Sequence, residues 1–402
     1  MSERQFDLKR RNGASVTAEI DRRAFLRRAV AGAMAFPMVN LGSHKLFASS
    51  EVRYSARAVD LVMGNQVFDM LSIMAPLGPM MLSAYGDNPK RTDTYNVPSE
   101  QVALLLSSGV DVFHPAVGLK TAEEVAGFIA RLNAYAAEYP EVFQRIDAIS
   151  DLDTLRKGER VGYIIGVQNS DHFQEVDDVN LYYSMGQRVS QLTYNSTNLI
   201  GTGATEEVDL GLSEYGHEVV GRMGELGMAI DVSHCGDQTT LDAFSASSKP
   251  VLITHSNVRV LAGGHVRCKS DEAIRAVAKS GSVMGITGVR NFVSDKEPTT
   301  LENILDHIDY VARLAGVEHV GIGSDMDMHG YDDIPEPAYS ALKSVYKSSY
   351  VFRDKLDTDG FDHPKRIFDL TEGLIRRGYT DEHIGMILGA NFRRVLGEIW
   401  QG

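Results

Sequence analysis

Two histidines and an aspartate, His234, His255 and Asp325, each follow a short apolar run that is typical of a buried β-strand. If these runs are parallel strands of one barrel, their carboxyl ends meet at one mouth. Imidazole nitrogens are ligands of zinc-type ions, and a nearby carboxylate can accept a proton from an activated water molecule. The three residues therefore predict a divalent metal site in which Asp325 is the proton acceptor.

Other polar side chains follow neighbouring apolar runs. Tyr194 could donate a hydrogen bond from its phenol to a developing oxyanion, and Arg267 could bind a carboxylate through its planar guanidinium. Asn169 is expected to contact the substrate. Gln168 and His114 are on the same rim, where either could add a ligand to a metal ion. Each histidine taken alone, His114 above all, could instead have a packing or capping role.

The elements that would position these residues alternate regularly along the chain. Amphipathic helical patterns lie between short apolar runs, and eight such runs predict a parallel (β/α)8 barrel of the α/β class. A six-stranded doubly wound sheet is the alternative. The strand-like runs are Val59–Val62 (extending at most to Phe68), Val110–His114, Val161–Val167, Val189–Thr193, Met228–Val232, Val251–Thr254, Val283–Ile286 and His319–Ile322.

The rest of the chain completes the barrel domain, which spans residues 49–402. The long segment Ser324–Asp362 is rich in Tyr, Ser and Pro and should lie over the mouth as a lid. Two helices, Pro364–Arg377 and Asp381–Leu396, form a C-terminal extension. The expected helices between the strands are Thr121–Ala137, Glu214–Leu226, Gln238–Ala246, Ser270–Ala278 and Leu301–Leu314.

Residues 1–48 differ from the rest. Paired arginines in Asp21–Arg27 precede the apolar stretch Ala29–Leu41, a pattern typical of a twin-arginine export signal. We expect the export machinery to recognise this segment, cleavage near Ala48, and a destination in the periplasm or outside a bacterial cell. A basic amphipathic helix is the alternative.

Charge and hydropathy argue against nucleic acid as a partner and against a membrane span. The 402 residues carry a formal net charge of −14, which argues against nucleic acid because phosphate binding needs clustered Lys and Arg. No apolar run reaches the roughly 20 residues of a membrane-spanning helix. The expected partner is a small peptide-like substrate.

The residues discussed so far resemble the membrane (renal) dipeptidases, zinc peptidases with a (β/α)8 fold. The resemblance covers most of residues 59–398. It implies that His234 and His255 bind one of two zinc ions, that Arg267 holds the substrate carboxylate and that Asp325 assists proton transfer. A homodimer is also the family-like expectation. The matching segments are Gly227–His234, Val251–Ser256, Arg267–Glu272, His319–Asp325 and Ile387–Phe392.

This sequence differs from that family mainly at the residues that would bind the second of the two zinc ions. The family's first strand ends in Asp-Gly-His-x-Asp, and its equivalent here is either Met63–Val67 or Asp69–Ile73, neither of which has the His-x-Asp pair. The bridging glutamate corresponds to Gln168, and the histidine after the fourth strand corresponds to Tyr194. Two ions would place four positive charges close together without the carboxylates that offset their repulsion.

A reduced site with one ion is therefore expected, with zinc as the first choice. His234 and His255 would bind it, and the third ligand could come from Asp325, Gln168 or His114. A site with no metal is the alternative.

The cysteines Cys235 and Cys268 directly follow His234 and Arg267. In an oxidising compartment they could form a disulfide that joins two loops of the mouth. A thiolate metal ligand and a pair of buried free thiols are the alternatives.

Three functions remain open. The first is an exported dipeptidase-like metallohydrolase that cleaves a small carboxylated peptide or amide. The second is an inactive or altered homologue that serves as a binding protein or as a maturation factor for a peptide-derived product. Metal-free chemistry such as isomerisation, with Asp325 as base, is the third. His234, His255, Arg267 and Asp325 favour the hydrolase.

Overall fold

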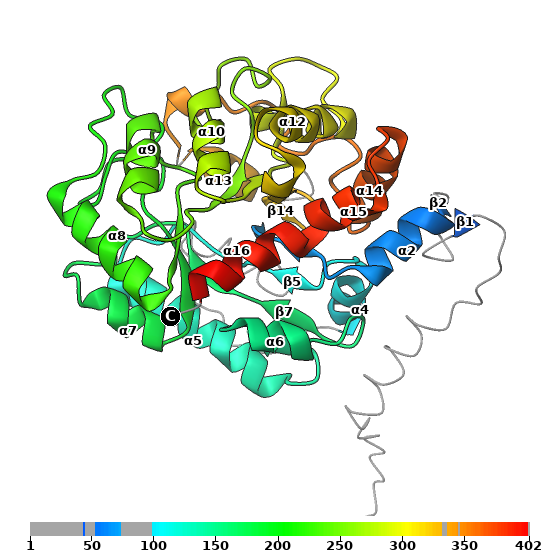
Figure 1. The fold of residues 1–402 in the computed structure, drawn as a ribbon, viewed down its shortest axis with the longest axis horizontal. Helices are drawn as coiled ribbons and strands as arrows, with labels where there is room; N and C mark the ends of the chain where they lie inside the picture. The colour runs from blue at the N-terminus through cyan, green and yellow to red at the C-terminus, as the bar shows by residue number, and fades with distance from the viewer. Residues whose placement is uncertain (1–42, 45–52, 74–98, 332–335, 345, 401–402) are drawn as a thin grey trace, which may run out of the picture.

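The structure is a computed structural model that describes residues 43–44, 53–73, 99–331, 336–344 and 346–400 (Figure 1). The predicted export motif, Asp21–Arg27 with the apolar stretch Ala29–Leu41, lies outside these residues. Among the helices that are described, none is long and apolar enough to cross a membrane.

Short parallel strands form a barrel, as the sequence predicts. Each pairs with its neighbours in parallel register, for example Phe68 opposite Val112, Ala229 opposite Val189 and Met284 opposite Val320. Strand β10 reaches β11 through a bridge between Asp231 and Leu252. The barrel strands are β3 (Phe68–Asp69), β5 (Val112–Phe113), β7 and β8 (Val161–Tyr163 and Ile165–Val167), β9 (Gln187–Gln191), β10 (Ala229–Asp231), β11 (Ile253–Ser256), β12 (Met284–Ile286) and β13 (Val320–Ile322).

The barrel closes between its first and last strands. Met70 N donates to Ile322 O at 2.8 Å. The fully buried Asp69 carboxylate accepts hydrogen bonds from the main-chain N and the hydroxyl of Ser324 at 2.7 and 2.6 Å. Two further short strands, β4 (Ser72–Ile73) and β14 (Met326–Asp327), continue this seam at the mouth.

Helices surround the strands (Figure 1). Their ends follow from local sequence: the Ser213 hydroxyl accepts from Gly216 N at the start of α8, and Gly227 with φ 77° ends that helix. Thr300 and Asn303 form a capping box at the start of α12. The helices are α4 (Ser99–Ser107), α5 (Ala122–Glu138), α6 (Ile149–Thr154), α7 (Asp178–Ser184), α8 (Glu214–Leu226), α9 (Asp237–Ala246), α10 (Asp271–Lys279), α11 (Arg290–Val293), α12 (Leu301–Leu314) and α14 (Arg366–Arg376).

The prediction of a strand at Val59–Val62 is wrong. These residues lie in helix α2 (Ala56–Gly64), whose N-cap Ser55 accepts from Ala58 N. The apolar run is one face of an amphipathic helix that buries Ala58, Leu61 and Val62 and packs against α14. Strand β6 (Phe143–Arg145), which pairs with β7, was not predicted.

The last helical segment closes the end of the barrel at which the strands begin. It is not one helix but α15 (Asp381–Gly385), a π-helical turn (Met386–Ala390) and α16 (Asn391–Trp400). Phe392, Val395, Leu396 and Ile399 pack against inward-facing residues near the starts of the strands, such as Val112 and Ala229. The amino-terminal end of the barrel is therefore sealed by α16.

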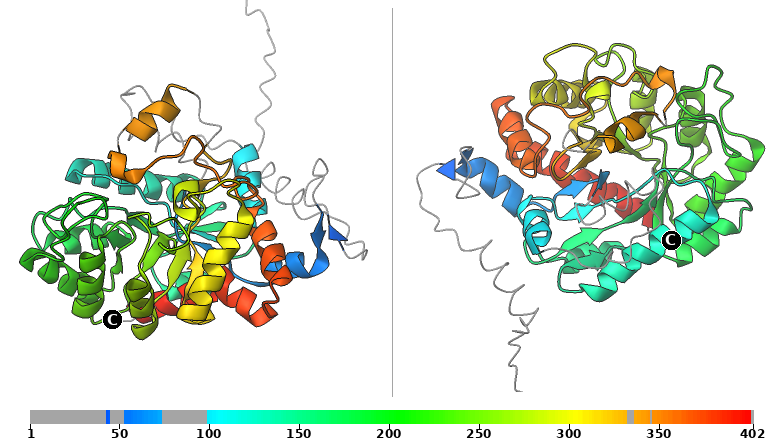
Figure 2. Two further views of the ribbon diagram at one scale, coloured as in Figure 1. Left: turned by 90° about the horizontal axis from the view of Figure 1, so that it is seen from above. Right: turned by 180° about the vertical axis from the view of Figure 1, so that it is seen from behind.

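The segment Ser324–Asp362, predicted as a lid, contains β14, α13 (Ala338–Ser344) and the short 3-10 helix η3 (Ser348–Tyr350). Figure 2 shows the orange helix α13 on one side of the barrel and the red helix α16 on the opposite side. The lid thus lies at the carboxyl ends of the strands, where the predicted site residues are.

Candidate active site

His234 and His255 face each other at the mouth of the barrel. Each is at most 1% exposed, and their Nε2 atoms are 3.0 Å apart. Burial, followed by the positive charge of Arg267, holds the pKa of both imidazoles well below the usual value. Both rings are therefore neutral at pH 7, the form in which histidine binds a metal ion.

The other ring nitrogen of each histidine is occupied. His234 Nδ1 lies 2.7 Å from Asn195 Oδ1, which can only accept, so Nδ1 carries the proton. His255 Nδ1 lies 2.8 Å from the Thr254 hydroxyl, which gives its own proton to Asp231 Oδ2 at 2.7 Å. The Thr254 oxygen is thus an acceptor, and His255 Nδ1 carries its proton too.

Both Nε2 atoms consequently present lone pairs to each other. Such an arrangement is repulsive unless a cation lies between them. Two Zn–N bonds of about 2 Å can join nitrogens 3.0 Å apart to one ion, so this pair fits one divalent cation. Within the described part of the chain, no third His, Cys, Asp or Glu completes a group of metal ligands.

His114 also lies at this end of the barrel. Its Nδ1 donates to Met70 O at 2.7 Å, whereas its Nε2 is buried without a hydrogen-bond partner among the described residues. Burial lowers the pKa of this imidazole, so it too is neutral. A Cβ on Gly166 would come within 1.8 Å of Nε2, so only glycine leaves room for this ring. His114 as a third ligand remains a prediction.

Gln168 and Asn169 are both buried beneath the mouth. Gln168 Nε2 donates to Ala116 O at 2.9 Å. The Asn169 side chain accepts from Ser170 N at 2.9 Å and donates to Asp171 Oδ2 at 2.8 Å. Asn169 thus stabilises its own loop in this structure, and its contact with substrate stays a prediction.

Asp325 has a left-handed backbone with φ 55°, and its carboxylate makes no hydrogen bond to any described residue. Burial raises the pKa of this carboxyl to about 7; the nearby Arg267 opposes the rise and Asp69 adds to it. A group with this pKa can take up and release protons near neutral pH, as a general base must.

Arg267 is 1% exposed and lies between the two histidine-bearing strand ends. Its Nη1 and Nη2 donate to the main-chain carbonyls of Ser233 and His255, while its Nε has no hydrogen-bond partner among the described residues. The guanidinium therefore stabilises the strand ends that carry the histidine pair. Its role in holding a substrate carboxylate stays a prediction.

Tyr194 covers one face of His234. The two rings stack with centroids 4.4 Å apart and planes 21° apart, and the tyrosine ring lies against Gly118, where a Cβ would be 2.9 Å away. The Tyr194 hydroxyl shares a 2.8 Å hydrogen bond with the hydroxyl of Tyr346 in the lid. The Tyr346 hydroxyl of the lid therefore bonds to the hydroxyl of Tyr194, the predicted oxyanion donor.

The position of the first barrel strand, β3, favours one of the two alignments of this chain with the dipeptidase motif. Met63 and Gly64 end helix α2, whereas Asp69 ends the barrel strand β3 and Met70–Ile73 follow it at the mouth. In the alignment that this position favours, the family's histidine and second aspartate correspond to Leu71 and Ile73. Neither side chain is a metal ligand, so these residues do not fit a second ion.

The predicted disulfide between Cys235 and Cys268 is wrong, because both are buried free thiols. Their sulfurs have different partners: Cys235 Sγ accepts from the Thr193 hydroxyl at 3.3 Å, and Cys268 Sγ donates to Phe292 O at 3.5 Å. Burial raises the pKa of Cys268 to about 12 and also raises that of Cys235, which disfavours thiolate ligands.

Several residues that orient the site were not assigned roles from the sequence. Asn195, Thr254 and Asp231 fix the tautomers of the histidine pair, and their positions next to the same strand ends could have suggested this. Tyr346 and Tyr331 reach the site from the lid, and no local pattern points to them.

Comparisons with known proteins show the family and the fold of this chain. The family model of membrane dipeptidase (peptidase family M19) matches residues 97–338, more than half of the chain. Among solved structures, an amidohydrolase from Pseudomonas aeruginosa superimposes with a TM-score of 0.72 and 22% identity, covering 86% of this chain and 99% of that one. The probable dipeptidase PvdM from the same organism gives 0.67 and 18%, covering 86% and 98%.

A third solved structure is a metallopeptidase from Rhodobacter sphaeroides bound to a phosphinate mimic of the dipeptide L-Ala-D-Ala. It gives a TM-score of 0.64 and 16% identity, covering 84% of this chain and 99% of that one. At these identities the solved structures establish the (β/α)8 fold, and the family model establishes the relationship. The chain belongs to the membrane dipeptidase family, whose members are metallopeptidases and hydrolases.

Proposed function

We propose that this protein is an exported dipeptidase-like hydrolase that cleaves a small carboxylated peptide or amide with a single divalent ion, zinc as the first choice. The observation that carries the proposal is the pair of neutral imidazoles, His234 and His255, whose lone pairs meet at 3.0 Å. A divalent ion bound there would polarise the scissile carbonyl and lower the pKa of a water molecule.

The protein's own groups would act around that ion. Asp325 would accept the proton of the attacking water, because its pKa of about 7 lets it exist as a carboxylate at neutral pH. The phenol of Tyr194 would donate to the oxyanion, and Arg267 would attract the carboxylate end of the substrate. Each role uses a group already at the mouth. Arg267 would bind the substrate through its Nε, which has no partner among the described residues, or by exchanging a main-chain carbonyl.

Metal content and turnover test this proposal together. The purified protein, loaded with zinc or manganese, should contain about one ion per chain by mass spectrometry and should hydrolyse dipeptides such as L-Ala-D-Ala. The variant His255→Ala should lose both properties. His217→Ala, which removes an exposed imidazole on α8, is the matched control and should keep them.

Absence of bound metal together with absence of turnover would contradict the proposal. Thermal stabilisation by dipeptides without turnover would indicate instead a binding protein or maturation factor.

We further propose that residues 1–48 export the folded protein through the twin-arginine pathway to the periplasm or the cell exterior. The paired arginines Arg22 and Arg23 before an apolar stretch support this. Replacing both with lysine should retain the protein in the cytoplasm, as fractionation would show. A homodimer remains a prediction that the molar mass in solution would test.

A further inference from the structure

The main chain at Asp325 has an unfavourable conformation that hydrogen bonds from other residues must stabilise. Its φ of 55° lies in the left-handed region, which is unfavourable for residues other than glycine. Two hydrogen bonds flank it: Asp325 N donates to Leu71 O at 2.7 Å, and the phenol of Tyr331 donates to Asp325 O at 2.8 Å. The second bond comes from a side chain six residues further along the chain.

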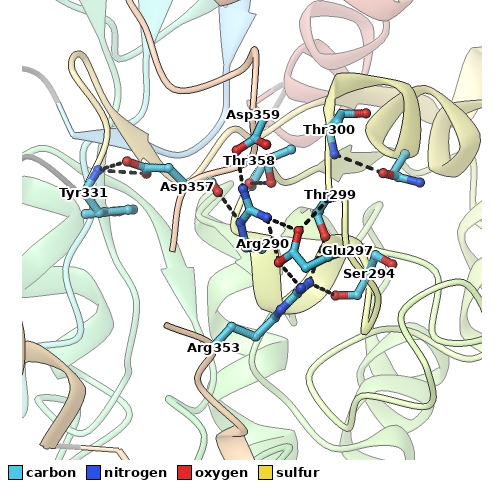
Figure 3. Close-up of polar contacts among 12 residues, drawn as sticks. Arg290, Ser294, Glu297, Thr299, Thr300, Tyr331, Arg353, Asp357, Thr358 and Asp359 are labelled. Atoms are coloured by element: carbon cyan, nitrogen blue, oxygen red, sulfur yellow. Dashed lines mark hydrogen bonds and ion pairs between the residues drawn. The ribbon is translucent and has the colours of Figure 1, made fainter. Parts of the chain in front are cut away.

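Tyr331 is itself fixed in place. Its main-chain N lies 2.8 Å from each oxygen of the Asp357 carboxylate (Figure 3). The preceding Gly330 has φ 83°, and a Cβ there would come within 2.4 Å of Asp357 Oδ2, so the turn requires glycine. Burial raises the pKa of the Tyr331 phenol well above its usual value, so the hydroxyl remains a donor.

Asp357 is anchored in turn by a buried arginine. Arg290, 1% exposed, donates through Nε to Asp357 O and through Nη1 to both carboxylate oxygens of Glu297 at 2.8 and 2.6 Å. Its Nη2 contacts Asp359, and Arg353 makes a second ion pair with Glu297 (Figure 3). Hydrogen bonds and ion pairs around Arg290 thus join the chain after β12 to the base of the lid.

We propose that Tyr331 is a positioning residue: its hydrogen bonds link the main chain of Asp325 to Asp357 and keep the Asp325 carboxylate at one place in the mouth. The proposal rests on the proposed hydrolytic function, in which Asp325 accepts the proton. It assigns no contact with substrate to Tyr331. Because a proton acceptor displaced by about 1 Å can lose much of its efficiency, the effect belongs to kcat and not to KM.

The test compares two lid tyrosines that make the same kind of bond. Tyr331→Phe removes the hydroxyl bonded to Asp325 O, and Tyr339→Phe removes one bonded to Asp354 O, also at 2.8 Å but not at the site residues. In the metal-loaded protein, Tyr331→Phe should lower kcat for a dipeptide about 10- to 100-fold with KM unchanged. Tyr339→Phe should leave both constants as in the wild type.

Unchanged kcat in Tyr331→Phe, or an equal loss in both variants, would overturn the proposal. If the wild type hydrolyses no dipeptide, the proposed function fails and kinetics give no information about Tyr331. Crystal structures of the wild type and of Tyr331→Phe then decide: a φ of Asp325 that leaves the left-handed region in the variant supports the positioning role, and an unchanged φ overturns it.

Discussion

At the scale of single residues, the catalytic role that we propose for Asp325 carries a cost in stability. Burial raises the pKa of its carboxyl from 3.8 to about 7, so the folded protein binds this proton more tightly than the unfolded chain does. The free energy of unfolding should therefore fall as the pH rises from about 4 to about 7. Ionisation, which the proposed base requires, is the destabilising step.

The substitution Asp325→Asn should separate these two effects. At pH 8 the variant should be more stable than the wild type by roughly 1–3 kcal/mol, less than the full shift implies because the group is partly exposed. At pH 4 the two proteins should unfold alike, as urea titrations at both pH values would show. Turnover should fall at least about 100-fold, and wild-type kcat/KM should rise through pH 7.

Equal stability of the variant and the wild type at pH 8 would contradict the burial of an ionised carboxylate. A wild-type pH profile that is flat between pH 6 and 8 would show that another group accepts the proton.

The histidine pair shows what the sequence can predict about a site. His234 and His255 follow consecutive strands, and consecutive parallel strands end side by side, so their proximity follows from the strand pattern alone. The same pattern places Asn169 at the mouth, but a strand end does not specify where a short amide points. In the structure its side chain bonds to Ser170, Asp171 and Asn198, and its contact with substrate stays a prediction. Tyr346 depends on how the lid folds back, which no local pattern encodes.

At the scale of elements, two of the lid's attachments to the rest of the protein differ in strength. Its base, Arg353 to Asp359, is joined to the buried Arg290 by a hydrogen bond and by ion pairs with Glu297 and Asp359. Its tip contacts the rest of the protein through Tyr346, which is bonded to Tyr194, and through Lys347, whose ion pair with Glu206 spans 2.9 Å. The exposed ion pair should contribute little, so the tip depends mainly on its aromatic contacts.

Tyr346→Phe should therefore lower kcat/KM about 2- to 10-fold, because it removes the hydrogen bond to the Tyr194 hydroxyl while leaving the ring in place. Lys347→Gln, which breaks the ion pair, should change kcat/KM less than about 3-fold. Steady-state kinetics on one dipeptide would measure both. A larger loss in Lys347→Gln than in Tyr346→Phe would show that the ion pair holds the tip.

Helices were predicted more accurately than the first strand, for a physical reason. The bounds of α8 and α12 agree with the prediction because caps such as Ser213 and Thr300 mark their starts. Val59–Val62 was assigned to a strand because short apolar runs occur in both strands and amphipathic helices. The N-cap Ser55 and the packing of α2 on α14 distinguish the helix from a strand.

At the scale of the whole molecule, one end of the barrel carries the candidate site and the other end contributes to stability. The carboxyl ends of the strands carry the site, whereas α16 seals the opposite end with Phe392 and its apolar neighbours. A Cβ on Gly321 would come within 2.3 Å of the Phe392 ring, so the seal is tightly packed.

Phe392→Ala should consequently destabilise the protein by about 3–5 kcal/mol, since it leaves a cavity in a fully buried position. Below its melting temperature the variant should keep the kcat/KM of the wild type. Thermal unfolding and kinetics at 25 °C would measure the two effects. A loss of activity in the folded variant would show that the two ends are coupled.

The seam of the barrel has a consequence for how such a chain can evolve. Asp69 closes the ring through Ser324, whereas the next motif positions, Leu71 and Ile73, contribute no polar side chain to that closure. Mutations at those two positions could therefore remove metal ligands without opening the barrel. If the site binds one ion, as we propose, an ancestor with two could have lost the other by small steps, each of which left a folded protein.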